Sequence, residues 1–209
     1  MSEAFAGRHS YRPADGHGLA HDPFNAIVAP RPIGWIGTRS GEGIANLSPY
    51  SFFNAVAYRP PTVMFASDGA KDTLRNVEAT RVFTWNLATR ALAEKMNATS
   101  ASVPADVDEF ALAGLTPIEG QAVPAPMVAE SPVAFECRVS DIVRLCTAAG
   151  ERMPNWIVIG EVVAVHIARH LIVEGSYDTA AAHPIVRGGG PADYFEISAD
   201  ARFRMPRPR

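Results

Sequence analysis

Cysteine, lysine and long apolar runs are scarce in this 209-residue sequence. Its two cysteines, Cys137 and Cys146, are too few for a disulfide framework, so a hydrophobic core has to stabilise the fold. No stretch approaches the roughly 20 apolar residues that a membrane-spanning helix needs. The N-terminus also lacks the basic and apolar regions of a signal peptide. We therefore expect a cytoplasmic protein without a membrane partner.

An excess of positive charge is missing as well. The formal net charge is −3 at pH 7, whereas nucleic acids and anionic membranes attract proteins with a concentrated basic surface. We therefore expect no nucleic-acid partner. With 47% hydrophobic and 20% charged residues, the chain has an ordinary globular composition, and its length suits one domain.

The domain is expected to occupy residues 23–199, between an extended N-terminal arm at 1–22 and a C-terminal tail at 200–209. The arm lacks sustained hydrophobic periodicity. It contains His9, His17 and His21, but their mixed spacing in a polar setting favours a solvated arm over a metal site. We therefore predict no metal centre.

Hydrophobic alternation and short apolar runs predict seven or eight strands. The expected ranges are 32–38, 46–54, 62–66, 82–87, 133–145 with a bulge near Asp141, 156–168, 171–173 and 194–197. Short helices are expected after a cap at Asp72 or Thr73 and at 89–97, with one helical turn at 106–111. Because no crossover helices alternate with the strands, a mainly β fold with short helices, an antiparallel barrel, is favoured over a doubly wound parallel sheet.

The stretch at 46–54 combines three aromatic side chains with hydroxyls and amides. A flat ligand with a polar edge, such as a flavin ring, needs that mixture. A half-buried strand with polar residues facing water is the alternative interpretation. Phe52 and Phe53 have opposite parity on a strand, so at most one of them can face a ligand.

A second candidate feature is the predicted helix start at Lys71, Asp72 and Thr73. Free backbone N–H groups and the helix dipole favour an anion such as a phosphate there. Lys71 is one of only two lysines in the chain, and Arg31 lies between two prolines as another rigidly held cation. An exposed helix with a solvated lysine is the alternative.

Together these motifs resemble the flavin reductase-like, FMN-binding split-barrel family that includes flavoredoxin. The resemblance rests on residues 30–36, 46–54, 60–61, 71–73 with Asn76, and 160–162 with His166. It implies a six-stranded antiparallel Greek-key split β-barrel and a homodimer that binds FMN near the subunit interface.

The same resemblance implies a set of FMN-binding residues. The isoalloxazine ring and ribityl chain would be lined by Arg31, Pro32, Ile33, Trp35, Ser48, Tyr50, Ser51, Phe52 and Asn54. The phosphate would be held by Ser67, Lys71 and Thr73.

His166 is a candidate catalytic residue, because this position lies near the flavin in similar proteins. On its strand it would share a face with Val158, Gly160, Val162 and Ala164, so a buried histidine bonded to a neighbour is the alternative. A zinc pair with His170 is excluded on a strand, where four residues separate side chains by roughly 13 Å.

Three functions remain open at the level of sequence. The first is an NAD(P)H-dependent flavin reductase that transfers a hydride from NADH or NADPH to FMN and then electrons to free flavin or a partner oxygenase. The second is a non-enzymatic electron carrier like flavoredoxin, reduced by a protein partner. The third is a barrel that binds another ligand.

Overall fold

The computed structural model describes residues 6–208 and is organised around one seven-stranded antiparallel sheet. The strand order is β3-β2-β6-β9-β10-β5-β4. Their bounds are β2 (Gly34–Arg39), β3 (Ala45–Tyr50), β4 (Phe53–Tyr58), β5 (Pro61–Asp68), β6 (Val82–Asn86), β9 (Val133–Cys146) and β10 (Arg152–Ile167). All of the long predicted strands are present, which confirms a mainly β protein with short helices.

The sheet is rolled. Its two edge strands, β3 and β4, are consecutive in the chain, so a short connection brings the two edges of the sheet towards each other. A corner at Ser51 and Phe52 joins β3 to β4, and it divides the single strand predicted at 46–54 into two. Across the roll, the Tyr50 ring on β3 lies 4.8 Å from the Phe65 ring on β5. Among residues 6–208, no strand pairing joins β3 to β4. The expected six-stranded split barrel is therefore corrected in its strand count: the sheet has seven strands and rolls up without closing.

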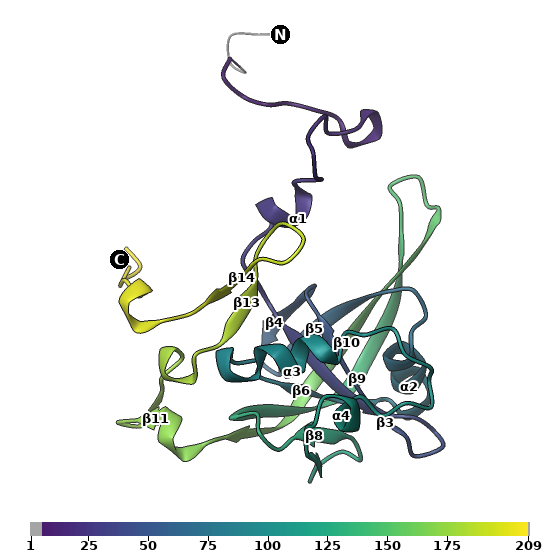
Figure 1. Cartoon of the computed structure of the whole chain (residues 1–209), viewed down its shortest axis with the longest axis vertical. Helices are drawn as coiled ribbons and strands as arrows, with labels where there is room; N and C mark the ends of the chain where they lie inside the picture. Colours follow the sequence, from purple (N-terminus) through teal and green to yellow (C-terminus); the bar gives the residue numbers. More distant parts are fainter. Residues whose placement is uncertain (1–5, 209) are drawn as a thin grey trace.

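Smaller strand pairs flank the main sheet. β1 (Arg31–Pro32), β13 (Ile185–Arg187) and β14 (Tyr194–Glu196) form a three-stranded sheet, which brings the C-terminal segment beside the start of the domain (Figure 1). The remaining pairs are β7 (Pro117–Glu119) with β8 (Pro126–Val128), and β11 (Ile172–Val173) with β12 (Ser176–Tyr177).

The helices are short, as predicted. They are α1 (Phe24–Ile27), α2 (Asp72–Thr80), α3 (Ala93–Ala98) and α4 (Glu109–Leu112), with 3-10 turns at Pro13–Asp15, Arg90–Leu92, Arg169–Leu171, Ala180–Ala182 and Ala199–Ala201. No helix among the described residues is long and apolar enough to cross a membrane.

Two hydrophobic cores lie on opposite faces of the sheet. Ile36 belongs to the core inside the roll, which α2 helps to close through Leu74 and Val77. Its neighbour Trp35 belongs to the core between the outer face and the helices α3 and α4. Successive residues of a strand point to opposite faces, so β2 is buried on both sides.

The register of the long β9–β10 ladder shifts at three places, one of them between Arg152 and Trp156. The register shifts between the pairs Ile159–Asp141 and Gly160–Val139, which confirms the bulge predicted near Asp141. The third shift, around Val163, changes which side chains of β10 face the core. His166 therefore shares a face with Ala164 but not with Val162. The predicted face is wrong for the residues before the bulge, because the bulge adds one residue to the alternation.

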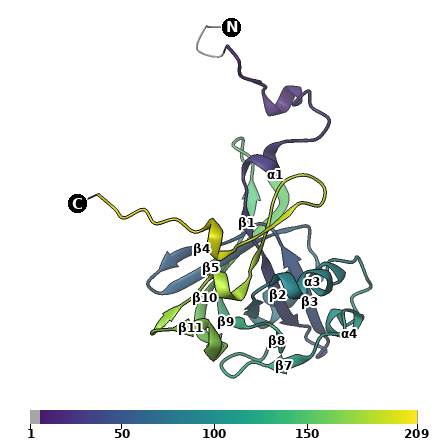
Figure 2. The ribbon, with the colours of Figure 1, turned by 60° about the vertical axis from the view of Figure 1, so that its left-hand side comes forward.

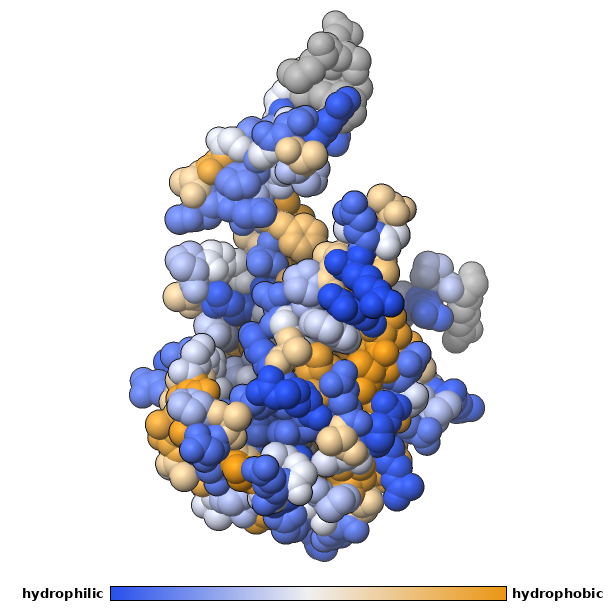
Figure 3. All heavy atoms as spheres, turned by 90° about the vertical axis from the view of Figure 1, so that its right-hand side faces the viewer, coloured by the Kyte–Doolittle hydropathy of each residue, from blue (hydrophilic) through white to orange (hydrophobic). Residues whose placement is uncertain are grey.

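Residues 6–22 of the N-terminal arm extend away from the rolled sheet (Figures 1 and 2). Within the arm, His9 Nε2 lies 2.7 Å from the carbonyl of His17. In the view of Figure 3 the surface is mostly hydrophilic, and apolar side chains gather in the middle of that face, below the arm. The arm therefore leaves these apolar side chains uncovered.

Replacing Gly160 is expected to destabilise the rolled sheet. A Cβ atom there would lie 2.4 Å from Cε1 of Phe83, a fully buried ring. Gly160→Ala should therefore lower the free energy of unfolding by about 1–3 kcal/mol, measured by urea denaturation. Gly41→Ala is the matched control, since nothing lies within 4 Å of the added carbon. Equal urea midpoints for the two variants would contradict the packing argument.

Candidate functional site

Four hydroxyl side chains from separate parts of the chain meet at one end of the rolled sheet. Ser48 and Tyr50 come from β3, and Ser67 comes from β5. Thr73 belongs to the first turn of α2 and completes the group, because the hydroxyls of Thr73, Ser67 and Ser48 all adjoin that of Tyr50. Folding thus collects hydroxyls from both motifs predicted to bind the ligand. We call these four residues the hydroxyl cluster.

Tyr50 has the least usual environment of the cluster. Only 7% of its surface is exposed, and its Oη atom makes no hydrogen bond to any residue in 6–208. Burial raises the pKa of the phenol, and the neighbouring hydroxyls oppose only part of that rise. The phenol is therefore protonated at neutral pH and has a hydrogen to donate. A buried hydroxyl without a partner is rare, because leaving one unpaired costs free energy.

The N-terminus of α2 adjoins the cluster. The helix starts at Asp72, its N-cap residue is Lys71, and no side chain caps its free N–H groups. The predicted cap at Asp72 or Thr73 is therefore wrong: Asp72 pairs with Arg75 instead, and Thr73 points into the protein. Uncapped N–H groups, the helix dipole and the exposed Lys71 together suit an anionic group.

A buried polar network supports the cluster from behind. Thr73 Oγ1 donates to Asn46 Oδ1 at 2.8 Å, and Thr38 Oγ1 donates to the same atom at 3.0 Å. Asn46 Nδ2 donates to the Glu109 carboxylate at 3.0 and 3.1 Å. Burial raises the pKa of Glu109, although hydrogen bonds from Leu47 and Asn46 act in the opposite direction. The network joins α4, β3 and α2 and fixes the position of Thr73.

Arg31 lies at the other end of the predicted site, and its guanidinium is already engaged. It donates to the carbonyls of Ser51 at 3.1 Å and Gly188 at 3.3 Å, and to those of Asn25 and Val28. The group also lies over the Phe52 ring, 5.5 Å from its centroid. Burial lowers the pKa of Arg31, and the nearby Arg187 lowers it further. Arg31 therefore joins the β3–β4 corner to the C-terminal segment.

A cavity of about 290 Å³ opens beside this corner. Ile33 and Ser51 line it, so it joins the two segments that were predicted to contact the ring. The residues that complete its wall are Pro49, Asn97, Ser100, Arg187, Pro191, Ala192 and Tyr194. Pro32 and Ile33 also line a second, mostly apolar cavity of about 460 Å³.

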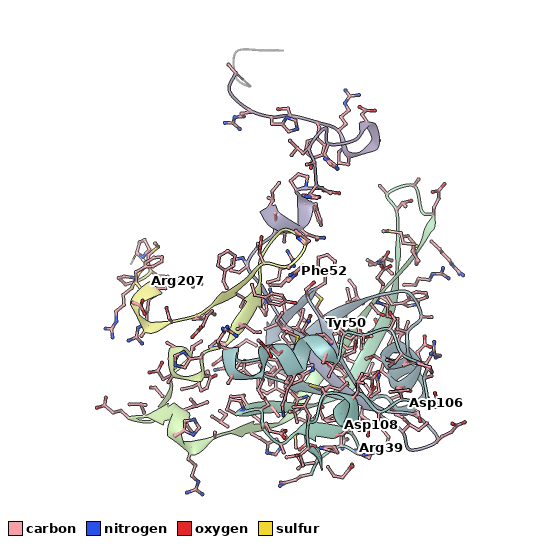
Figure 4. All side chains as sticks on the ribbon, viewed as in Figure 1. Arg39, Tyr50, Phe52, Asp106, Asp108 and Arg207 are labelled. Atoms are coloured by element: carbon pink, nitrogen blue, oxygen red, sulfur yellow. The ribbon has the colours of Figure 1, made fainter. Side chains whose placement is uncertain are left out.

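The predicted aromatic contacts separate into core and surface. The Trp35 side chain is fully buried and donates from Nε1 to Thr99 Oγ1 at 3.0 Å, so it offers no surface to a ligand. Phe53 is core and stacks on Trp85, whereas Phe52, in the corner between β3 and β4, is 43% exposed. Only one of the two is therefore accessible to a ligand, as predicted, although the corner and not strand parity separates them. Figure 4 shows Phe52 near the C-terminal hairpin and Tyr50 deeper in the protein.

Asn54 and His166 lie apart from the hydroxyl cluster. Asn54 is exposed on the edge strand, where its side chain bonds the next backbone N–H. His166 on β10 is paired with Ala134 of β9, and its side chain lies on the outer face of the sheet. Its Nε2 atom lies 2.7 Å from Glu136 Oε1. The bond to a neighbouring side chain that the alternative predicted is present, but the His166 side chain is 33% exposed and not buried as predicted.

Glu136 is the feature that the sequence pattern missed. A charged residue that alternates with apolar ones on a strand is typically solvent-facing, yet the exposure of Glu136 is 0%. It accepts backbone N–H bonds from Gln121, Ala122 and Val123 at 2.6–3.0 Å. Gly120 lets this loop approach, because a Cβ there would lie 2.6 Å from Glu136 Oε2. The loop that buries Glu136 precedes it by 13 to 15 residues and lies outside the strand pattern.

Known proteins resemble this chain in sequence and in structure. An uncharacterized protein of Aquifex aeolicus is 42% identical over 118 residues, which are 54% of this chain and 60% of that protein. The structure of nitrilotriacetate monooxygenase component B from Bacillus cereus is 28% identical, with a TM-score of 0.84 over 94% of this chain and 98% of that one. The 2-nitrobenzoate 2-nitroreductase of Pseudomonas fluorescens is also 28% identical, with a TM-score of 0.77 and coverage of 87% and 88%.

The rolled antiparallel sheet and the uncapped helix start beside the hydroxyl cluster define a mainly β protein with a site suited to an anionic group. More specifically, the chain belongs to the flavin reductase like domain family, whose model matches residues 28–181. The match includes Arg31, the hydroxyl cluster and Lys71, although the cavity residues from Arg187 to Tyr194 lie beyond it. It confirms the family predicted from the sequence motifs.

Proposed function

We propose that this chain is an FMN-binding oxidoreductase that accepts a hydride from NADH or NADPH and passes electrons to free flavin or a partner oxygenase. The observation that carries the proposal is the buried, unpaired hydroxyl of Tyr50 beside an uncapped helix N-terminus. Membership of the flavin reductase like domain family supports it. The similarity to one component of a monooxygenase supports the oxygenase as acceptor.

The residues of the chain have distinct roles in this proposal. Lys71 and the first N–H groups of α2 bind the phosphate, because both present positive charge to it. Ile33 and Ser51 contact the ring end from the cavity beside the β3–β4 corner. Arg31 positions that corner through its carbonyl contacts. FMN, when bound, supplies the redox chemistry itself, so binding and orientation are the protein's main tasks.

His166 is left out of the proposed chemistry. Its Nε2 is engaged by Glu136, and it lies on the outer face of the sheet, away from Ser48 and Tyr50, which face the interior. We assign it to the support of the loop above Glu136.

A homodimer with the flavin near its interface is part of the proposal. Strand β4 is an edge strand whose Val56 and Tyr58 are 53% and 83% exposed. Exposed apolar side chains on an unpaired edge favour association with another chain. Light scattering coupled to size exclusion tests this part, and a monomer at micromolar concentration would contradict it.

The test of the proposed function is anaerobic stopped-flow spectroscopy of the purified protein with added FMN. We expect the flavin absorbance to bleach after mixing with NADH or NADPH, because bound FMN takes the hydride. Free FMN at the same concentration is the control. Failure to oxidise either nucleotide would contradict the reductase.

The same measurement separates the two alternatives. Stable FMN binding without nicotinamide oxidation would select an electron carrier that is reduced by a protein partner. A colourless protein whose melting temperature does not change with FMN would select a barrel for another ligand, because a ligand that binds only the native state must stabilise it.

A further inference from the structure

The hydroxyl cluster contains fewer free donors than its composition implies. A serine or threonine hydroxyl carries a single hydrogen, so it can donate only one hydrogen bond at a time. Ser67 Oγ donates to the carbonyl of Gly69 at 2.9 Å. Thr73 Oγ1 donates to Asn46 Oδ1 at 2.8 Å. Two of the predicted phosphate ligands have therefore already used their hydrogens within the protein.

The direction of the Thr73 bond is fixed by the network behind it. Asn46 Nδ2 faces the two oxygens of Glu109, so the amide oxygen of Asn46 must face Thr73. An amide oxygen has no hydrogen, and Thr73 is therefore the donor. Reversing the amide would place its NH₂ group against two hydroxyls and its oxygen against the Glu109 carboxylate.

Tyr50 retains the hydrogen that the other two have used. Its Oη atom is the one buried side-chain N or O atom in residues 6–208 without a hydrogen-bond partner. The hydroxyls of Ser67 and Thr73 adjoin it and hold its ring end between β5 and α2. The phenol oxygen has no hydrogen-bond partner within residues 6–208, so the oxygen of a ligand that reaches the cluster can accept its hydrogen.

We propose that the Tyr50 hydroxyl donates a hydrogen bond to the phosphate of the bound flavin, whereas Thr73 is a positioning residue that orients the cluster. The inference rests on the proposed function, because it takes the ligand to be FMN. A phosphate oxygen only accepts hydrogen bonds, so it needs the donor that Tyr50 offers. Tyr50 then selects FMN over riboflavin, which has the same ring without the phosphate.

The Tyr50→Phe variant tests this assignment in the full-length protein. We expect the dissociation constant of FMN to rise about tenfold or more, because the lost bond is to a charged group, and that of riboflavin to change less than about twofold. Fluorescence quenching of each flavin measures both constants. The melting temperature of the ligand-free variant should stay the same or rise, since the lost hydroxyl has no protein partner.

Thr73→Val is the matched variant, because it removes a hydroxyl that is bonded internally. It should lower the melting temperature of the ligand-free protein and leave the ratio of FMN to riboflavin affinity within about threefold of the original. A selective loss of FMN in Thr73→Val, or an unchanged affinity ratio in Tyr50→Phe, would overturn the assignment. So would a lower melting temperature in ligand-free Tyr50→Phe.

Inorganic phosphate tests the assignment in the absence of flavin. It should raise the melting temperature of the unaltered protein more than that of Tyr50→Phe, and equal shifts would overturn the assignment. If the unaltered protein binds neither flavin, the proposed function fails, but the experiment with inorganic phosphate still tests the role of Tyr50. If it binds FMN and riboflavin equally, flavin binding stands and the role of Tyr50 fails.

Discussion

Glu136→Ala is expected to lower the free energy of unfolding by about 3 kcal/mol, because it removes a fully buried acceptor. The backbone N–H groups of Ala122 and Val123, together with the His166 ring, would lose their partner. The loop after Gly120 would then no longer be held against β9. Urea denaturation followed by circular dichroism measures the loss.

Glu130→Ala is the control for that prediction. Glu130 also accepts hydrogen bonds from a backbone N–H and a hydroxyl, both of Thr116, but it is exposed. Water can replace it, so the expected loss is below about 1 kcal/mol. Similar losses of unfolding free energy in the two variants would show that burial does not strengthen the contribution of the Glu136 hydrogen bonds to stability.

Glu136 also makes the stability depend on pH. Burial alone would raise the pKa of its carboxyl, but the bonds from His166, Ala122, Val123 and Gln121 outweigh burial and hold the pKa below its usual 4.5. The pKa of Glu136 is therefore lower in the folded protein than in the unfolded chain. At pH values between these two pKa values the unfolded chain binds more protons than the folded one, so stability falls as the pH drops through the window below about 4.5. Glu136→Gln should flatten that part of the stability curve.

The second large effect is expected at the phosphate end of the proposed site. Lys71→Glu should weaken FMN binding by about 10- to 100-fold, because it replaces an attractive charge at the start of α2 with a repulsive one. Riboflavin has no phosphate, and its affinity should change less than about threefold. Fluorescence titration of both flavins at low and high salt measures the effect, which should shrink as salt screens the charges.

Lys95→Glu is the matched control, since Lys95 is the only other lysine in the chain. It belongs to α3, where its Nζ donates to the carbonyl of Gly114 at 2.6 Å. The change in net charge is the same, so a shared loss of FMN affinity would indicate a general charge effect. An equal loss of FMN and riboflavin in Lys71→Glu would remove the phosphate assignment.

Local pattern predicted most of the strands because each one alternates or is continuously apolar over its own length. It failed where one extra residue shifts the alternation. The bulge at Val163 moved His166 to the opposite face from the one expected, and the corner at Ser51 and Phe52 divided one predicted strand into two. Bulges and corners depend on contacts with neighbouring strands and loops, and the sequence of the strand alone does not specify these contacts.

The sequence by itself determined the β class, the short helices, the family, and the two segments that carry the candidate ligand contacts. Their order and spacing are local properties, so they could be recognised without coordinates. Only the tertiary structure decided which of those side chains are available. It buried Trp35, committed Arg31 to carbonyls and Thr73 to Asn46, and left the Tyr50 hydroxyl unpaired, because hydrogen-bond partners and burial are set by chain segments that are distant in sequence.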